Sequence, residues 1–196
     1  MPEMSKTAVV VIDVQEGILA GIAGHREAEA ERALDAMVWR IHDLLRRARA
    51  AGAPVIYVQH EGGVGHRLEP GAAGYPIREE IAMKRGDLLI PKKFCDSFYE
   101  TGLQSALERL GVEHLVMCGC MTQYCVDTSV RRAVSLGYDV TLVKDGHMTA
   151  DSGELTFEQI VAHHNRVLEG FDAGAHVVRV AAAGEIRFGE EKTATS

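Results

Sequence analysis

Residues 112–137 read VEHLVMCGCMTQYCVDTSVRRAVSLG, and the rest of the chain is organised around this stretch. Its first part, residues 115–118, is an unbroken apolar run of the kind found in buried strands. Gly119 interrupts the run. Apolar or small side chains then recur at helical spacing up to Gly137, a residue type that often follows the end of a helix. We therefore predict a strand that passes into a helix, with Cys125 among the first residues of the helix.

Cys125 has two interpretations at this position. At the start of a helix it would lie at the positive end of the helix dipole, beside backbone N–H groups that lack partners. Both features favour a thiolate and a nearby oxyanion. Alternatively, Cys125 is a small buried side chain, because free cysteine is among the most buried residue types. The stretch alone leaves both interpretations open.

Strand-like and helix-like segments alternate along the remaining chain. Helices are predicted at residues 26–51, 100–110 and 154–171, with a short one at 77–83. Further strands are predicted at residues 7–14, 54–59, 88–90, 139–143 and 176–180. Such alternation indicates right-handed βαβ units and a mostly parallel sheet, hence an α/β fold. With no repeat, linker or shift in composition, we expect one domain over residues 1–196, with a polar tail from about residue 185.

One segment fits no regular element. Residues 61–75 contain five glycines and one proline and are too polar for a buried helix or strand. A loop of this length in a compact domain is usually functional or mobile. We expect it to contribute to the walls of any binding pocket.

Composition narrows the class of protein. The 196 residues are 46% hydrophobic and 25% charged, enough for one large core. A net charge of −7 argues against a nucleic-acid partner, and no apolar run approaches the roughly 20 residues that span a bilayer. The N-terminus lacks the pattern of a secretory signal, which favours reduced thiols at the four cysteines. We expect a cytoplasmic enzyme or binding protein with a small-molecule partner and no membrane partner.

Polar or reactive residues follow several predicted strands. Asp13, His60, Lys92 and the pair Gly119–Cys120 all lie at carboxyl ends. In open parallel sheets, ligands bind at this edge, close to the point where the strand order reverses. The coincidence predicts an active site there.

Asp13 and Lys92 are the candidate partners of Cys125. A carboxylate that ends a buried strand is costly unless it is paired, although Asp also serves as a helix cap or turn residue. Lys92 and Lys93 follow Pro91, and lysines in such places are commonly solvated. If all three groups meet, the aspartate could act as general base, and the lysine could lower the thiol pKa or orient a substrate.

Metal and cofactor sites find little support in the sequence. Cys118, Cys120 and Cys125, with His60, His66 and His114, are zinc-type ligands, but their spacing lacks the paired pattern of a structural zinc site. No glycine-rich phosphate loop follows the first strand, and no G-x-S-x-G turn occurs. We expect no cofactor and no metal.

Four motifs in order resemble the isochorismatase-like cysteine hydrolases. They are VVVIDVQ, PVIYVQHE, PKKFCDSFYETGLQSAL and LVMCGCMTQYCVDTSVRRAVSLGYDVTLVKD, and the similarity runs from about residue 7 to residue 180. The resemblance implies a three-layer α/β/α sandwich with a six-stranded, mostly parallel, doubly wound sheet. It also implies a homo-oligomer, either a dimer or a tetramer.

The same resemblance assigns roles to residues. It implies a catalytic triad of Asp13, Lys92 and Cys125; Lys92 is preferred to Lys93 because the family's lysine precedes an aromatic residue by six positions, here Phe98. It further implies a cis peptide bond between Cys120 and Met121, with the amides of Met121 and Cys125 forming an oxyanion hole. Candidate pocket walls are Gln15, His60, Phe98 and Tyr124.

Two departures from the pattern narrow the activity. Nicotinamidases of this superfamily carry a metal-binding Asp-x-His, where this chain reads Val58-Gln59-His60. True isochorismatases often lack the nucleophilic cysteine, which is present here. The resemblance therefore implies an amidohydrolase that cleaves a C–N bond of a small amide or cyclic amide through a Cys125 thioester. The alternatives are a vinyl-ether hydrolase that uses Asp13 without covalent catalysis, and a non-catalytic binding protein on the same fold.

Overall fold

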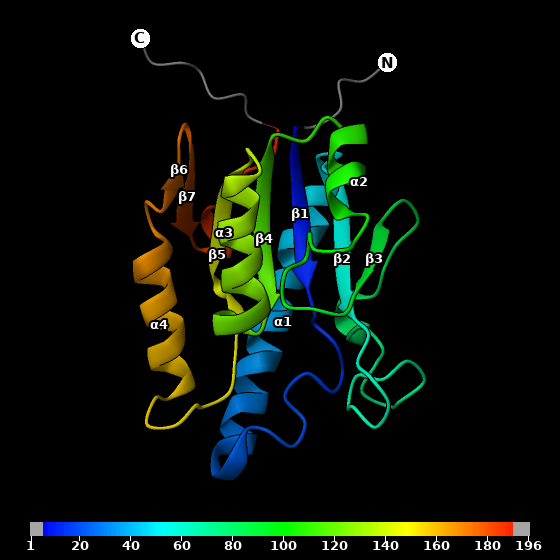
Figure 1. Cartoon of the computed structure of the whole chain (residues 1–196), viewed down its shortest axis with the longest axis vertical. Coiled ribbons are helices and arrows are strands. Elements are labelled where there is room, and N and C mark those ends of the chain that lie inside the picture. Colours follow the sequence, from blue (N-terminus) through cyan, green and yellow to red (C-terminus); the bar gives the residue numbers. More distant parts are fainter. Residues whose placement is uncertain (1–5, 190–196) are drawn as a thin grey trace.

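A computed structural model describes residues 6–189 of the chain. Its centre is a seven-stranded sheet in the order β3-β2-β1-β4-β5-β7-β6, in which all neighbouring strands are parallel except β6 and β7 (Figure 1). The strands are β1 (Thr7–Ile12), β2 (Val55–His60), β3 (Leu88–Lys92), β4 (His114–Cys120), β5 (Asp139–Met148), β6 (Asp172–Ala173) and β7 (His176–Ala181).

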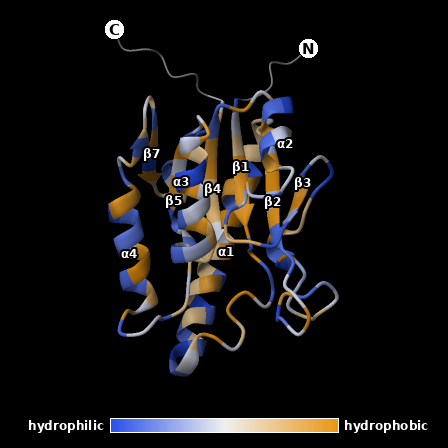
Figure 2. Ribbon diagram, in the orientation of Figure 1, coloured by the Kyte–Doolittle hydropathy of each residue, from blue (hydrophilic) through white to orange (hydrophobic). Residues whose placement is uncertain are grey.

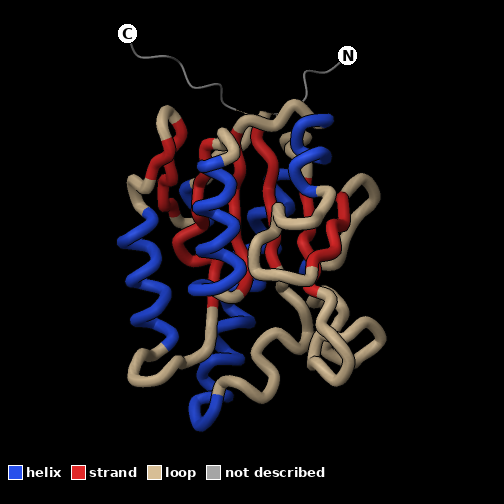
Figure 3. Tube along the Cα trace, viewed as in Figure 1, coloured by secondary structure: helices blue, strands red, loops and turns tan. Residues whose placement is uncertain are grey.

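Helices cover both faces of the sheet and make three layers. The long helix α1 (Glu27–Ala50) packs on one face, and α2 (Leu103–Arg109), α3 (Asp127–Ser135) and α4 (Phe157–Leu168) lie on the other (Figures 1 and 3). Short turns complete the described chain: η1 (Gly24–Arg26), η2 (Glu79–Ile81), η3 (Thr122–Val126, a π turn) and η4 (Ala183–Glu185). The predicted α/β sandwich is confirmed. None of the described helices is long and apolar enough to cross a membrane.

Strand β1 shows why this sequence forms a buried central strand. Its side chains alternate between two apolar cores, because successive residues of a strand point to opposite faces. Val9 and Val11 pack on the α1 side, whereas Val10 and Ile12 pack on the side of α2 and α3. A strand covered on both faces needs an unbroken apolar run, and Figure 2 shows such hydrophobic strands at the centre of the molecule.

The strand order reverses between β1 and β4. From β1 the sheet grows to β2 and β3 on one side and to β4 and β5 on the other. The carboxyl ends of these two strands lie side by side, with Ile12 paired to Gly119. Asp13 and Cys120 therefore follow neighbouring positions at the switch point, where α/β sheets bind ligands.

Several boundaries differ from the sequence prediction. The seventh strand, β6, was not expected; its two residues are too few to show any periodicity. Strand β3 runs on through Pro91 to Lys92, which an edge strand permits because one side of its backbone has no neighbour. Strand β5 extends to Met148 past a register shift, beyond the predicted end at residue 143.

Three helices and the tail also differ. The helix expected at residues 77–83 is only the turn η2, and α2 begins at Leu103 rather than at residue 100. Helix α4 begins later than predicted because Thr156 caps its start, and it ends at Leu168 rather than at residue 171. The polar tail expected from residue 185 is wrong for its first part. Ile186 is buried, and its carbonyl oxygen accepts a hydrogen bond from Arg47 at 2.6 Å. The rest of the predicted tail, residues 190–196, lies outside the described residues.

The loop at residues 61–75 is irregular, as predicted, and lies at the carboxyl edge of the sheet (Figure 1). It packs closely on the segment after β1. A Cβ atom on Gly17 would lie 2.7 Å from the Cα atom of Gly74, so only glycine allows the two backbones to approach this closely. The two loops together form one side of the edge where Asp13 lies.

Candidate active site

Three side chains from different elements meet at the switch point. Asp13 directly follows β1, Lys92 ends β3, and Cys125 lies in the turn η3 between β4 and α3. The Nζ atom of Lys92 lies 2.6 Å from Oδ2 of Asp13 and 3.2 Å from Sγ of Cys125. The structure thus brings together the three residues to which the resemblance assigned a triad.

Lys92 is buried and fully hydrogen-bonded. Its side chain has no exposed surface, and its third hydrogen bond goes to the carbonyl oxygen of Phe94 at 3.0 Å. An ammonium group has three donors, so every one of them has an acceptor. Burial would lower the lysine pKa, but the Asp13 carboxylate and Cys125 outweigh it, and the pKa of Lys92 is raised. Lys92 is therefore a fixed positive charge, whereas Lys93 is exposed.

Asp13 is held in an unusual backbone conformation. Its φ of 51° lies in the left-handed region, which few residues other than glycine adopt. Its amide donates to the Val58 carbonyl oxygen at 2.9 Å, and its side chain is 1% exposed. Burial raises the pKa of the Asp13 carboxyl, and the charge of Lys92 only partly opposes this effect. Its Oδ1 atom is buried with no hydrogen-bond partner among the described residues.

Cys125 is a thiol at rest. Burial and the neighbouring Asp13 carboxylate raise the pKa of the thiol well above its ordinary value, and Lys92 only partly offsets them. The expectation that a helix start would favour the thiolate is wrong here: Cys125 lies inside the π turn before α3, and burial is the largest of the effects that raise the pKa of its thiol. The thiol must lose its proton to a base before it can attack, and Asp13 lies close enough for its charge to act on this thiol.

The turn before Cys125 contains an unusual peptide bond. The bond between Cys120 and Met121 is cis, as the resemblance implied. The carbonyl oxygen of Met121 accepts hydrogen bonds from the amides of Tyr124 and Val126, at 3.0 and 3.2 Å. These bonds fix the backbone path from the end of β4 to Cys125.

Among the candidate pocket walls, His60 is adjacent to the triad. It ends β2 and pairs in register with Lys92. Burial and the charge of Lys92 lower the pKa of His60 to about 4, so its ring is neutral near pH 7. Its Nδ1 atom has no hydrogen-bond partner among the described residues, and its ring meets that of His66 edge-on at 5.6 Å. His60 is thus a neutral polar group beside the triad with unused hydrogen-bonding capacity.

Gln15 and Phe98 do not have the positions expected of pocket walls. The Gln15 side chain is fully buried; it donates to the carbonyl oxygens of His60 and Tyr75, at 3.1 and 2.8 Å, and accepts from the His60 amide. It ties β2 to the loop and has no exposed surface for a ligand. Phe98 is buried in the core, where its ring stacks on Tyr138 at 6.2 Å. The sequence could not show that these side chains are used inside the fold.

Tyr124 and Phe94 are two exposed aromatic side chains beside this site. Tyr124 lies in the turn η3 and is 49% exposed. Phe94, which we did not predict, is equally exposed, and its ring meets Tyr99 edge-on at 5.3 Å. Because the Phe94 carbonyl oxygen accepts from Lys92, this residue is part of the site. Its position two residues after Lys92 is the sequence feature from which its place in the site could have been predicted.

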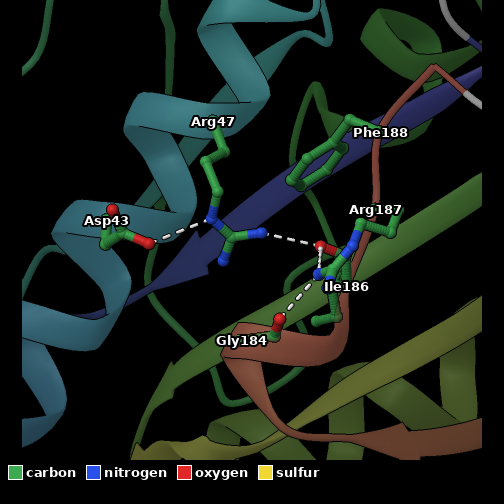
Figure 4. A pocket seen from close by; sticks show the side chains of 6 residues that line it. All are labelled: Asp43, Arg47, Gly184, Ile186, Arg187 and Phe188. Carbon is green, nitrogen blue, oxygen red and sulfur yellow. Dashed lines mark hydrogen bonds and ion pairs between the residues drawn. The ribbon is translucent and has the colours of Figure 1, made fainter.

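The described cavities lie elsewhere. One, of about 450 Å³, lies between α1 and residues 184–188 (Figure 4). In Figure 4 the Arg47 guanidinium faces Asp43 and the Ile186 carbonyl, so its donors serve the fold. Another cavity, of about 520 Å³, is lined by Glu16 and residues 78–80. Within residues 6–189, no three His, Cys, Asp or Glu side chains are grouped so as to hold a metal ion.

Comparison with known proteins gives consistent matches. Residues 7–182 match the family model of the isochorismatase domain. The streptothricin hydrolase of Streptomyces noursei is 35% identical over 74% of this chain, which spans only half the length of that relative. The ureidoacrylate amidohydrolase of Rhizobium rhizogenes is 32% identical over 72% of this chain and 70% of its own. The crystal structure of an isochorismatase from Pseudomonas putida KT2440 has a TM-score of 0.81 at 29% identity and covers 95% of this chain and 93% of its own.

Proposed function

This chain belongs to the isochorismatase family of hydrolases, and we propose that it is an amidohydrolase that cleaves a C–N bond of a small amide or cyclic amide. The observation that carries the proposal is the buried Lys92 ammonium, which contacts both the Asp13 carboxylate and the Cys125 thiol. A buried acid, a fixed cation and a thiol in contact are the parts that covalent acyl transfer requires.

The reaction begins with proton transfer. Asp13 takes the proton of the Cys125 thiol, and the raised pKa of its carboxyl makes it a stronger base than an exposed aspartate. The sulfur then attacks the amide carbonyl carbon and forms a C–S bond. Lys92 keeps its charge beside both groups and stabilises the negative charge while it moves from the carboxylate to the sulfur.

The tetrahedral intermediate carries its charge on the former carbonyl oxygen. In this proposal the backbone amides of Met121 and Cys125 donate to that oxygen. The C–N bond breaks when protonated Asp13 gives its proton to the leaving nitrogen, which leaves a thioester on Cys125. Water attacks the thioester as Asp13 accepts its proton; the C–S bond breaks, the acid leaves, and the thiol recovers its proton.

Relatives with named substrates support the amide class. One is named as an amidohydrolase of ureidoacrylate and is 32% identical to this chain, and another is named as a hydrolase of streptothricin and is 35% identical. Neither identity is high enough to transfer a substrate. His60, which is neutral and whose Nδ1 atom has no hydrogen-bond partner within residues 6–189, is the proposed contact for a polar group of the substrate.

Substitution of Cys125 tests this function. Wild type, Cys125→Ala and Cys125→Ser would be assayed for hydrolysis of ureidoacrylate, streptothricin and nicotinamide, with Cys95→Ser as the control for loss of an exposed thiol. We expect hydrolysis of at least one amide by wild type and Cys95→Ser, and a loss of at least a thousandfold in kcat for both Cys125 variants. Full turnover by Cys125→Ala would rule out covalent catalysis.

One observation favours a second candidate. The raised pKa of Asp13 would also suit a general acid that protonates a vinyl ether without any covalent step. Such an enzyme would hydrolyse isochorismate, and Cys125→Ala would retain that activity. The same variant therefore separates the two reactions.

A further inference from the structure

A row of hydrogen bonds leads from the turn that carries Cys125 to helix α4. Oγ1 of Thr122 lies 3.0 Å from Nδ1 of His147, and Nε2 of His147 lies 3.1 Å from Oδ1 of Asn165. The side-chain nitrogen of Asn165 donates to the carbonyl oxygen of Lys144 at 3.0 Å. Thr122 belongs to η3, His147 to β5 and Asn165 to α4, so the row joins three elements.

The donor and acceptor in each hydrogen bond follow from the end of the row at Lys144. The Lys144 carbonyl can only accept, so the Asn165 nitrogen faces it and the Asn165 oxygen faces His147. Nε2 of His147 must then carry a hydrogen. His147 is 3% exposed, and burial lowers its pKa to about 4, so the ring is neutral and Nδ1 carries none. The Thr122 hydroxyl is therefore the donor, and all three bonds run the same way, which strengthens each of them.

Thr122 lies where its hydrogen bond with His147 can hold the turn that contains Cys125. It is fully buried, directly follows Met121 and precedes Cys125 by three positions. Thr122 is the first residue of the turn η3, after Met121, and its side chain forms the hydrogen bond with His147. The turn thus has an anchor on β5 in addition to its contact with Lys92.

We propose that Thr122 and His147 are positioning residues, whose hydrogen bond holds the turn η3 so that Cys125 stays aligned with Asp13 and Lys92. The inference rests on the proposed function, in which this turn carries the nucleophile and the oxyanion hole. Neither side chain touches the reacting atoms. They act on the rate by fixing the backbone, and small misplacements of a nucleophile lower the rate strongly.

Thr122→Val tests the inference, because valine has nearly the same shape and lacks the donor. Thr122→Ser keeps the hydroxyl. The matched control is Thr141→Val. Oγ1 of Thr141 lies 2.9 Å from Nε2 of His114, so this substitution also removes a Thr–His hydrogen bond. That bond joins β4 to β5 at the end of these strands that is far from η3. The readouts are kcat and KM for whichever amide of the panel wild type hydrolyses, and hydrogen–deuterium exchange of the peptide covering residues 119–127.

We expect Thr122→Val to lower kcat at least tenfold with KM changed less than threefold, and to speed exchange at residues 121–126. Thr122→Ser should restore kcat to within about threefold of wild type. Thr141→Val should leave kcat and this peptide unchanged, whatever its effect on the melting temperature. Wild-type kcat in Thr122→Val, or a drop of equal size in Thr141→Val, would overturn the inference.

The experiment remains decisive if Thr122→Val does not fold or if the proposed function fails. If Thr122→Val does not fold, Asn165→Leu breaks the next bond of the row, and we expect faster exchange at residues 121–126 with kcat lowered about threefold; no change would refute the anchor. If no amide is hydrolysed, or Cys125→Ala stays active, the proposed function fails, yet the exchange comparison still decides whether His147 holds the turn. Unchanged exchange in Thr122→Val refutes the anchor and leaves the proposed function intact.

Discussion

Lys92 sets the electrostatics of the site. Its ammonium group, with no exposed surface, has the Asp13 carboxylate, the Cys125 sulfur and a backbone carbonyl as its three acceptors. A buried carboxylate with raised pKa and a buried thiol with raised pKa would both be neutral without it. In the proposed reaction the Lys92 ammonium stabilises one negative charge, first on the Asp13 carboxylate and then on the Cys125 sulfur.

Lys92→Met should therefore cost both stability and activity. Methionine fills a similar volume without charge, so Asp13 loses its partner while still buried. Breaking one side of a buried ion pair typically costs about 3–5 kcal/mol. Urea unfolding at pH 7 measures the loss, and the kcat of the same variant should fall below detection.

Lys93→Met is the matched control for that experiment. Lys93 is exposed and adjacent in sequence, so its loss should change the unfolding free energy by less than about 0.5 kcal/mol. Equal effects of the two substitutions would contradict the assignment of Lys92 as the buried cation.

The sequence alone predicted which three side chains meet at the candidate site, but it did not predict their surroundings. Each of the three has a recognisable place beside an apolar strand. Asp13 directly follows β1, Lys92 ends β3, and Cys125 lies in the segment that follows β4. Gln15 and Phe98 were placed wrongly because sequence does not show which side chains are used by the fold itself. The raised thiol pKa was also missed, since desolvation depends on what packs around the sulfur.

At the scale of elements, the close approach of β1 and β4 positions the site. Gly119 has a φ of 125° and pairs with Ile12, and a Cβ atom there would overlap the Ile12 carbonyl oxygen. A side chain at this position would push the strands apart, together with Asp13 and the turn that carries Cys125. The sequence marked Gly119 only as the break between a strand and a helix.

Gly119→Ala should destabilise the fold by more than about 3 kcal/mol, because backbone strain and a steric overlap add. Gly86→Ala separates the two contributions. Gly86 has a similar φ of 100°, but a Cβ atom added there would meet no other atom within 4 Å, so this substitution should cost only the strain, about 1 kcal/mol. Thermal unfolding of both variants gives the comparison, and equal losses would show that the approach of the strands is not the constraint.

Element boundaries were predicted unevenly for physical reasons. The central strands are covered on both faces, so their apolar runs marked them well. The ends of β3 and β5 and the two-residue β6 depend on backbone pairing with neighbours, which leaves little trace in side-chain pattern. The π turn that holds Cys125 was taken for the first turn of α3 for the same reason.

On the scale of the whole molecule, the doubly wound topology gathers the chemistry at one edge. Reversal of the strand order between β1 and β4 places residues from distant parts of the chain together, beside the loops at residues 15–24 and 61–75. The shared core is common to the family, whereas these loops form the surroundings of the site. The reaction class can thus be argued from the core, and the substrate must be read from the loops.

The covalent intermediate on Cys125 is the central claim to test. Wild-type protein would be mixed with the fastest amide of the panel, quenched in acid within milliseconds to seconds, and digested for peptide mass spectrometry. We predict the mass of the substrate's acyl group on the peptide containing Cys125, at a level that rises before steady state and disappears when substrate is exhausted. Turnover that proceeds while Cys125 stays unmodified at every time point, or an acyl group found on Cys95 instead, would contradict it.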